Sequence, residues 1–138
     1  MEKEINYTIL MADDDEDDCN LAKESFFECC DQTSVGCVPD GLDLMDYLVE
    51  HSQSSAKELP KLILLDLNMP RMDGRQALVE IKAKPTLKNI PIVIFTTSGE
   101  ESDIALTMNA GADLFVTKPA SFDEWLNIMR SLVDRWLN

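Results

Sequence analysis

The chain is poor in positive charge and in histidine, and it lacks the cysteine spacings that usually bind zinc. It has 12 lysine and arginine residues against 26 aspartate and glutamate residues, which gives a formal net charge of −14. So acidic a surface repels nucleic acids and anionic lipids, and we therefore expect no nucleic-acid ligand and no membrane association. There is one histidine, and the four cysteines form no C-x-x-C pair, so the usual zinc spacings are missing.

Long apolar runs and an export signal are also missing. No apolar run could cross a bilayer, and the first residues, MEKEINY, lack the apolar core of a signal peptide. We therefore expect a cytoplasmic protein in which Cys19, Cys29, Cys30 and Cys37 are free and mostly buried thiols. The 138 residues contain no repeat or long linker, so we expect one domain over residues 1–138 and no output domain.

Short apolar runs alternate with segments of helical periodicity. The runs are continuously apolar, which is typical of strands that are covered on both faces in a parallel sheet. The predicted strands are residues 7–12, 34–38, 62–65, 92–95 and 114–116, and the predicted helices are 16–30, 42–49, 75–82, 102–109 and 121–136. Right-handed crossovers would then give an α/β fold with a doubly wound parallel sheet and helices on both faces.

Single residues indicate two helix ends and one apolar helix face. Ser121 is expected to cap the last helix, and Gly111 is expected to end the fourth. The apolar residues at helical spacing in the fourth helix are Ile104, Ala105 and Met108.

The last helix has more apolar residues than one sheet face requires. One stripe consists of Phe122, Leu126, Met129 and Val133, and a second consists of Trp125, Ile128, Leu132 and Trp136. A helix that covers a sheet needs only the first stripe. The second is either a partner surface or part of a deeply buried helix, and both interpretations stay open.

Acidic residues follow two of the predicted strands directly. Asp13 and Asp14 come after the first strand, and Asp66 comes after the third. Ligands of open α/β sheets bind at the carboxyl ends of the strands. If these strands are neighbours, three carboxylates converge there, and Mg²⁺ would relieve their mutual repulsion. The next acids, residues 16–18, are instead interpreted as a solvated start of a helix.

A hydroxyl group and an ammonium group are predicted at the same edge of the sheet. Thr96 and Thr97 end the fourth strand, and Lys118 ends the fifth. Taken singly, a threonine at a strand end usually reflects β-propensity, and a lysine is usually a solvated surface residue. Together with the acids they suit phosphoryl transfer, in which a carboxylate is the nucleophile and metal, lysine and hydroxyl groups stabilise the charge on oxygen.

Residues 62–74, LILLDLNMPRMDG, resemble the phosphoacceptor segment of two-component response-regulator receiver domains. The matching features are the aspartate at Asp66, the Met-Pro that follows it and the Asp-Gly three residues after the proline. Further residues fall where that family has them, and the resemblance extends over residues 7–136. These further matches are Asp13, Asp14, Thr96, Lys118 and Pro119.

The resemblance implies a flavodoxin-like (βα)₅ fold with a five-stranded parallel sheet in the order 2-1-3-4-5. It implies a phosphoacceptor switch in a phosphorelay and not an enzyme, apart from self-phosphorylation by small donors and autodephosphorylation. The implied partners are a sensor histidine kinase and a downstream protein target or phosphotransfer protein.

The resemblance also assigns roles around the implied Mg²⁺ ion. Asp66 would accept the phosphoryl group and contact the metal. Asp14 would ligate the metal directly, Asp13 would act mainly through metal-bound water, and Asn68 would offer its backbone carbonyl.

Other implied roles concern the phosphoryl group and the switch. The hydroxyl of Thr96, next to Thr97, would turn to the phosphoryl group, and Lys118 would pair with one of its oxygens. The resemblance implies that the bond before Pro119 is cis, as such receivers often have, and cis bonds are cheap only before proline. Phe115 stands where the family often has a switch tyrosine, and a plain core aromatic is the other interpretation.

A looser similarity concerns a subgroup of receivers. Four features look like single-domain receivers that serve bacterial phytochrome kinases: the polar segment 51–59, residues 66–68 (DLN), residues 96–98 (TTS) and the Trp136-Leu137 tail. In that subgroup, dimerisation through the fourth helix, fifth strand and fifth helix is typical, so a homodimer through that face is one expected assembly.

Two other functions remain as alternatives at this stage. Asp66-Leu67-Asn68 faintly resembles the D-x-D motif of haloacid-dehalogenase-type hydrolases, so a Mg²⁺-dependent phosphatase with an aspartyl nucleophile is one. A phosphorylation-independent adaptor on the same fold is the other.

Overall fold

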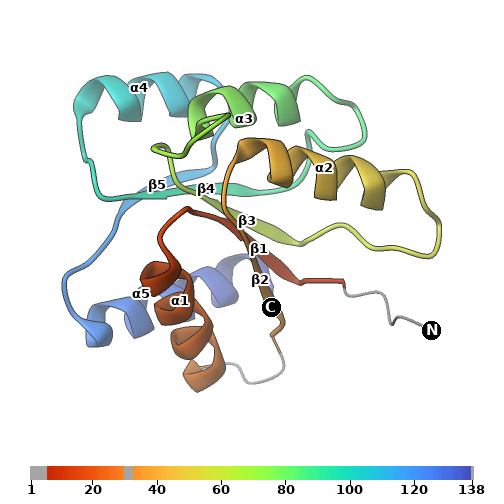
Figure 1. Cartoon of the computed structure of the whole chain (residues 1–138). Helices are drawn as coiled ribbons and strands as arrows, with labels where there is room; N and C mark the ends of the chain where they lie inside the picture. Colours follow the sequence, from red (N-terminus) through yellow and green to blue (C-terminus); the bar gives the residue numbers. More distant parts are fainter. Residues whose placement is uncertain (1–5, 30–32, 138) are drawn as a thin grey trace.

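Strands and helices alternate along the described residues, 6–29 and 33–137, of the computed structural model (Figure 1). The strands are β1 (Ile9–Ala12), β2 (Val35–Val38), β3 (Leu62–Leu65), β4 (Ile92–Thr96) and β5 (Leu114–Thr117). The helices are α1 (Glu16–Cys29), α2 (Gly41–Ser52), α3 (Gly74–Lys82), α4 (Glu101–Asn109) and α5 (Phe122–Trp136). The predicted alternation is confirmed, with most boundaries within three residues.

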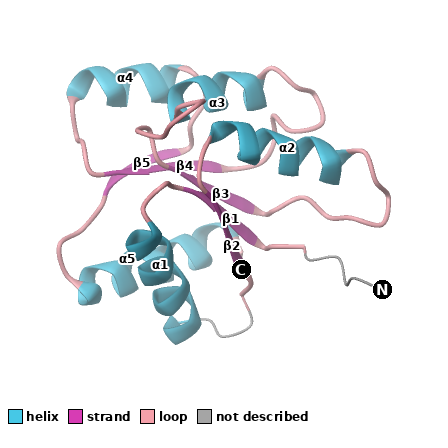
Figure 2. Ribbon diagram, in the orientation of Figure 1, coloured by secondary structure: helices cyan, strands magenta, loops and turns pink. Residues whose placement is uncertain are grey.

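The strands form one parallel sheet in the order β2-β1-β3-β4-β5, which confirms the predicted flavodoxin-like topology. Helices α2, α3 and α4 lie on one face, and α1 and α5 lie on the other (Figure 2). In the register, Ala12 at the end of β1 pairs with Leu65 at the end of β3. The residues that follow these two strands therefore emerge side by side.

Two hydrophobic cores lie between the sheet and its helices, one on each face of the sheet. Successive side chains of a strand point to opposite faces, so Leu10 joins the core under α2 and α3 while Ile9 and Met11 join the core under α1 and α5. The four residues of β1 and the four of β3 are all buried, which is why these strands read as continuous apolar runs. The strands that end at the acidic residues are therefore packed on both faces.

The predicted helix ends are confirmed. The Ser121 hydroxyl accepts a hydrogen bond from the backbone N–H of Glu124 and caps α5. Gly111 follows the end of α4 with a positive φ of 108°, a conformation that favours glycine. Within the described residues, no helix is long and apolar enough to span a membrane.

The buried face of α5 differs from both predicted stripes. Trp125 and Leu132 from the second stripe are buried together with Met129 and Val133, so the partner-surface interpretation is wrong for these two residues. Trp125 meets the ring of Phe95 edge-on at 5.0 Å, and its indole N–H donates to the carbonyl of Pro119. These contacts turn the helix so that the first stripe is only partly buried.

Helix α4 is packed much less than its apolar content suggests. Thr107 is its only buried residue, while Ile104, Leu106 and Met108 are 36%, 49% and 40% exposed. The helix lies over the edge strand β5, whose residues are half-buried or exposed. Apolar side chains of α4 therefore face solvent.

Two of the expected thiols can be assessed fully. Cys19 is buried, Cys37 is half-buried, and both are free thiols as predicted. Cys29 is half-buried, and Cys30 lies outside the described residues.

Candidate functional site

Three carboxylates converge where β1 and β3 end. Carboxylate oxygens of Asp13, Asp14 and Asp66 lie within 4.8 Å of one another. The backbone N–H of Asp66 donates to the carbonyl of Ala12 at 3.0 Å, so the strand pairing itself brings these acids together. Asp13 and Asp66 are buried while Asp14 is exposed, so one side of the cluster is open to solvent. The predicted convergence of the three acids is therefore observed.

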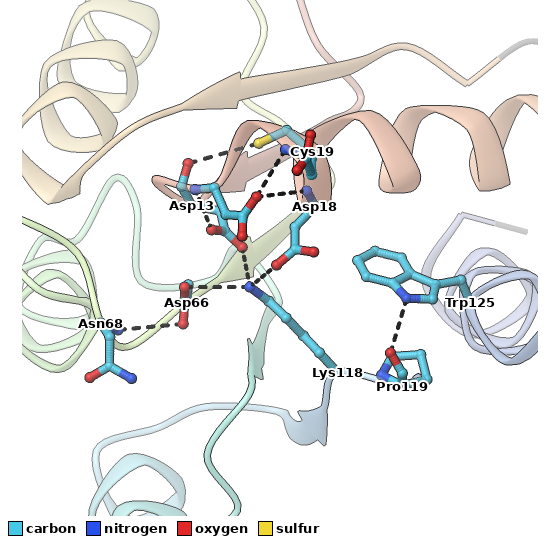
Figure 3. Close-up of polar contacts among 10 residues, drawn as sticks. Asp13, Asp18, Cys19, Asp66, Asn68, Lys118, Pro119 and Trp125 are labelled. Carbon is cyan, nitrogen blue, oxygen red and sulfur yellow. Dashed lines mark hydrogen bonds and ion pairs between the residues drawn. The ribbon is translucent and has the colours of Figure 1, made fainter. Parts of the chain in front are cut away.

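Lys118 extends from the end of β5 into the same cluster (Figure 3). Its ammonium nitrogen lies 2.6 Å from a carboxylate oxygen of Asp13, 2.7 Å from Asp18 and 3.5 Å from Asp66. Only 5% of the side chain is exposed. The surrounding carboxylates outweigh the effect of burial and raise the pKa of Lys118, so the group carries its charge at neutral pH.

Asp18 is a site residue that the sequence interpretation missed. It was assigned to a solvated helix start, which is wrong for this residue because it contacts the Lys118 ammonium directly. Asp18 lies in the first turn of α1, where an acidic residue is common for other reasons. No local signal in the sequence marks it, because its partner Lys118 is 100 residues away.

Thr96 and Thr97 are placed very differently. Thr96 is fully buried at the end of β4, and its hydroxyl oxygen has no hydrogen-bond partner among the described residues. Buried hydroxyl groups are normally hydrogen-bonded, so this one is available to a ligand. Thr97 is exposed.

The loop after β3 is held by contacts at both ends. The backbone N–H of Asn68 donates to a carboxylate oxygen of Asp66 at 3.4 Å. Further along, Arg71 adopts a positive φ of 62° and its guanidinium group binds Asp40 at 2.7 Å and Asp43 at 2.9 Å. The loop is thereby tied to the start of α2. Sequence reasoning did not identify Arg71 because its partners are 28 and 31 residues away.

The peptide bond between Lys118 and Pro119 is trans, which contradicts the predicted cis bond. The trans form of an X–Pro bond is intrinsically favoured by about 0.5–1 kcal/mol. In this conformation the Lys118 side chain reaches Asp13 and Asp18, and the carbonyl of Pro119 accepts a hydrogen bond from Trp125. No local contact in the described structure requires the cis form.

Phe115 lies on β5, near Lys118 in sequence. It is half-buried and packs against the core on the α2–α3 side of the sheet. The contact fits the interpretation as a core aromatic, and its role in switching stays a prediction.

Comparison with known proteins shows the family to which the chain belongs. Residues 9–130 match the family model of the response regulator receiver domain. The chain belongs to this receiver family. It is a receiver domain of two-component phosphorelay signalling, which favours that function over the hydrolase and adaptor interpretations.

Individual relatives support the looser subgroup similarity. Response regulator Rcp1 of Synechocystis sp. is 33% identical over 129 residues, covering 94% of this chain and 88% of Rcp1. The structure of the phosphorylated cyanobacterial phytochrome response regulator RcpA has a TM-score of 0.86 and 34% identity, covering 97% of this chain and 96% of that chain. The receiver is therefore similar to phytochrome-associated response regulators.

One solved relative contains a divalent metal. The Mn²⁺-bound form of Rcp1 has a TM-score of 0.82 and 32% identity, and the alignment covers 94% of both chains. Together with the three-carboxylate cluster, this supports a divalent metal site in the receiver described here.

Proposed function

We propose that this receiver accepts a phosphoryl group on Asp66 from a histidine kinase, with Mg²⁺ held by the neighbouring carboxylates. The observation that carries the proposal is the convergence of Asp13, Asp14 and Asp66 within 4.8 Å beside the Lys118 ammonium. Carboxylate and carbonyl oxygens are the ligands that Mg²⁺ prefers, and the exposed side of Asp14 leaves room for water.

The residues divide the work between metal and phosphoryl group. Asp14 and Asp66 would hold the ion directly, Asp13 would hold it mainly through water, and Asn68 would add its backbone carbonyl. When bound, Mg²⁺ neutralises charge on the phosphoryl oxygens. A bound cation would also stabilise the folded protein, because it would relieve the repulsion among the three carboxylates.

In the transfer step, a carboxylate oxygen of Asp66 attacks the phosphorus of the kinase phosphohistidine. A bond between that oxygen and phosphorus forms while the bond between phosphorus and the imidazole nitrogen breaks. Lys118 pairs with a phosphoryl oxygen, and the unpartnered hydroxyl of Thr96 donates to another, with Thr97 at the rim.

The output is proposed to be protein contact. The exposed apolar residues of α4 support an assembly through α4, β5 and α5, and a homodimer through that face is the form we propose.

Phosphorylation would shift a pre-existing equilibrium between two states of the receiver. The Phe115 side chain would occupy different positions in these states and so change the α4–β5–α5 face. A downstream target or phosphotransfer protein completes the relay, and no nucleic acid, membrane partner or enzymatic turnover is proposed. The cytoplasmic location of the protein and its organisation as a single domain over residues 1–138 stay predictions.

Phosphorylation should depend on the divalent metal. Incubation with acetyl phosphate and Mg²⁺ is expected to add one phosphoryl group per chain, as measured by intact-protein mass spectrometry. Removal of Mg²⁺ with a chelator is expected to abolish the addition, because the carboxylate cluster then repels the anionic donor. Equal incorporation in the presence of chelator, or steady hydrolysis of a generic phosphate ester, would contradict the proposal.

Metal binding should weaken as the pH falls through about 6. Burial raises the pKa of Asp13 to about 6, although Lys118 lies beside it and lowers the value. A proton on Asp13 competes with the metal, so the apparent affinity for Mg²⁺ is constant well above pH 6 and decreases below it. Calorimetric titration at pH 5.5 and pH 7.5 measures the difference, and Asp13→Asn should remove this contribution. An affinity in the original chain that does not change between these pH values would count against a metal at Asp13.

A further inference from the structure

The Lys118 ammonium group is shared unequally among its carboxylate neighbours. Its nitrogen is at hydrogen-bonding distance from Asp18, 2.7 Å, and at 2.6 Å from Asp13. The distance to Asp66 is 3.5 Å, which is an ion-pair contact outside the range of a strong hydrogen bond. In the unphosphorylated site, Lys118 is therefore bound more closely to the other two acids than to the residue that takes the phosphoryl group.

Asp18 differs from the other acids because it lies outside the metal cluster. The carboxylates that gather within 4.8 Å are those of Asp13, Asp14 and Asp66, and Asp18 is not among them. Asp18 comes from the first turn of α1, and its side chain reaches Lys118 from the opposite side to Asp66 (Figure 3). A bound metal would draw on Asp13 and Asp66 but would leave Asp18 free to keep its hydrogen bond to Lys118.

The bond between Asp18 and Lys118 competes with phosphoryl binding. An ammonium group is a compact charge with three donors on a flexible stem, so it settles where the negative charge is nearest. Asp18 is 19% exposed and Lys118 is 5% exposed, so solvent weakens their attraction only in part. To bind a phosphoryl oxygen on Asp66 at hydrogen-bonding distance, the ammonium group would move toward Asp66 from its present position beside Asp13 and Asp18.

We propose that Asp18 is a positioning residue that holds the Lys118 ammonium away from Asp66 and thereby slows phosphoryl uptake. The inference rests on the function proposed above. Because Asp18 acts through Lys118, it affects the rate at which Asp66 is phosphorylated without contacting the metal or the phosphorus. It is a restraint on activation that comes from the first turn of α1.

The variant Asp18→Asn tests the proposal, with Asp17→Asn as the matched control. Asp17 lies in the same helical turn and carries the same charge, but it is exposed and its backbone N–H bonds to Asp15. Each variant is phosphorylated by acetyl phosphate at saturating Mg²⁺. We expect Asp18→Asn to raise the rate constant about fivefold, the size expected when a partly exposed charge-assisted hydrogen bond is lost. We expect Asp17→Asn to leave the rate constant within about twofold, since exposed charges are well screened.

Two further variants separate positioning from a general effect on structure. Asp18→Glu keeps the carboxylate and should stay close to the original rate. In a Lys118→Ala background, Asp18→Asn should have no effect, because the group through which Asp18 acts has gone. The same pattern should appear without turnover, as tighter equilibrium binding of beryllofluoride to Asp18→Asn than to Asp17→Asn.

The outcomes distinguish this inference from the proposed function. If the original chain takes no phosphoryl group, the proposed function fails. If the original chain is phosphorylated but Asp18→Asn is equal to it, slower than it, or no faster than Asp17→Asn, only the positioning role of Asp18 fails. Persistence of the Asp18→Asn effect without Lys118 would also overturn that role.

Discussion

Replacing Gly74 by alanine is expected to lower the free energy of unfolding by about 3 kcal/mol, at the upper end of the usual cost of overpacking. A β-carbon at this position would lie 2.0 Å from the carbonyl oxygen of Asp66 and 2.9 Å from the α-carbon of Leu67. Both are backbone atoms, and neither can rotate away as a side chain would. The backbone N–H of Gly74 also donates to the carbonyl of Leu67 at 3.0 Å, so relief of the clash would break a contact that starts α3.

Thermal and urea denaturation measure this effect, with Gly99→Ala as the control. A β-carbon at Gly99 would come no closer than 3.1 Å to any neighbour, and that neighbour is the side-chain oxygen of Thr117. We expect Gly74→Ala to reduce the melting temperature by about 10 °C and Gly99→Ala to reduce it far less. Equal losses in the two variants would show that the close approach of α3 to Asp66 does not matter for stability.

Replacing Lys118 by alanine is expected to destabilise the metal-free protein by about 3 kcal/mol at pH 8, because breaking a buried ion pair leaves a buried charge without its partner. Asp13 has a side chain with no exposed surface, and Lys118 is the cation beside it. Loss of that cation raises the pKa of Asp13 beyond its value of about 6. The folded state then binds more protons than the unfolded state, so the penalty grows as the pH rises and shrinks below pH 6.

Denaturation at pH 5 and pH 8, with and without Mg²⁺, tests this account of Lys118. The penalty should be smaller at pH 5, and saturating Mg²⁺ at pH 8 should recover part of it by supplying another cation. Lys88→Ala, which removes an exposed lysine, should cost little at either pH. A penalty for Lys118→Ala that is equal at both pH values would mean that Asp13 is not the group left unpaired.

The sequence was sufficient for the sheet and for the acids at its edge. The strands β1 and β3 are buried on both faces, so their apolar runs are unbroken and easily recognised. Parallel register then forces Asp13 and Asp66 together, because the residues that end the two strands are paired. A site made by strand ends is predictable for this reason.

Features that depend on distant side chains could not be predicted in the same way. Asp18 becomes a site residue only because Lys118, 100 residues further on, reaches it. The buried face of α5 is decided by the contacts of Trp125 with Phe95 and with the carbonyl of Pro119. Helical periodicity identifies apolar residues but does not say which of two overlapping stripes will meet the sheet.

Helical periodicity alone did not show the exposed face of α4, for a related reason. Its apolar residues have helical spacing, which normally indicates burial. In the structure α4 lies over the edge strand β5, and Thr107 is the only residue of the helix that is buried. Periodicity cannot show how much of a helix an edge strand covers.

Locating the phosphoryl group tests the central claim most directly. After reaction with acetyl phosphate and Mg²⁺, borohydride would reduce an acyl phosphate to an alcohol and so mark the modified carboxyl group permanently. Trypsin would release residues 62–71, a peptide in which Asp66 is the only acidic side chain. The account predicts the mark on this peptide, its loss in Asp66→Asn and its retention in Asp46→Asn, which changes an exposed acid on α2. A mark on any other carboxyl group, or one that survives Asp66→Asn, would contradict the account.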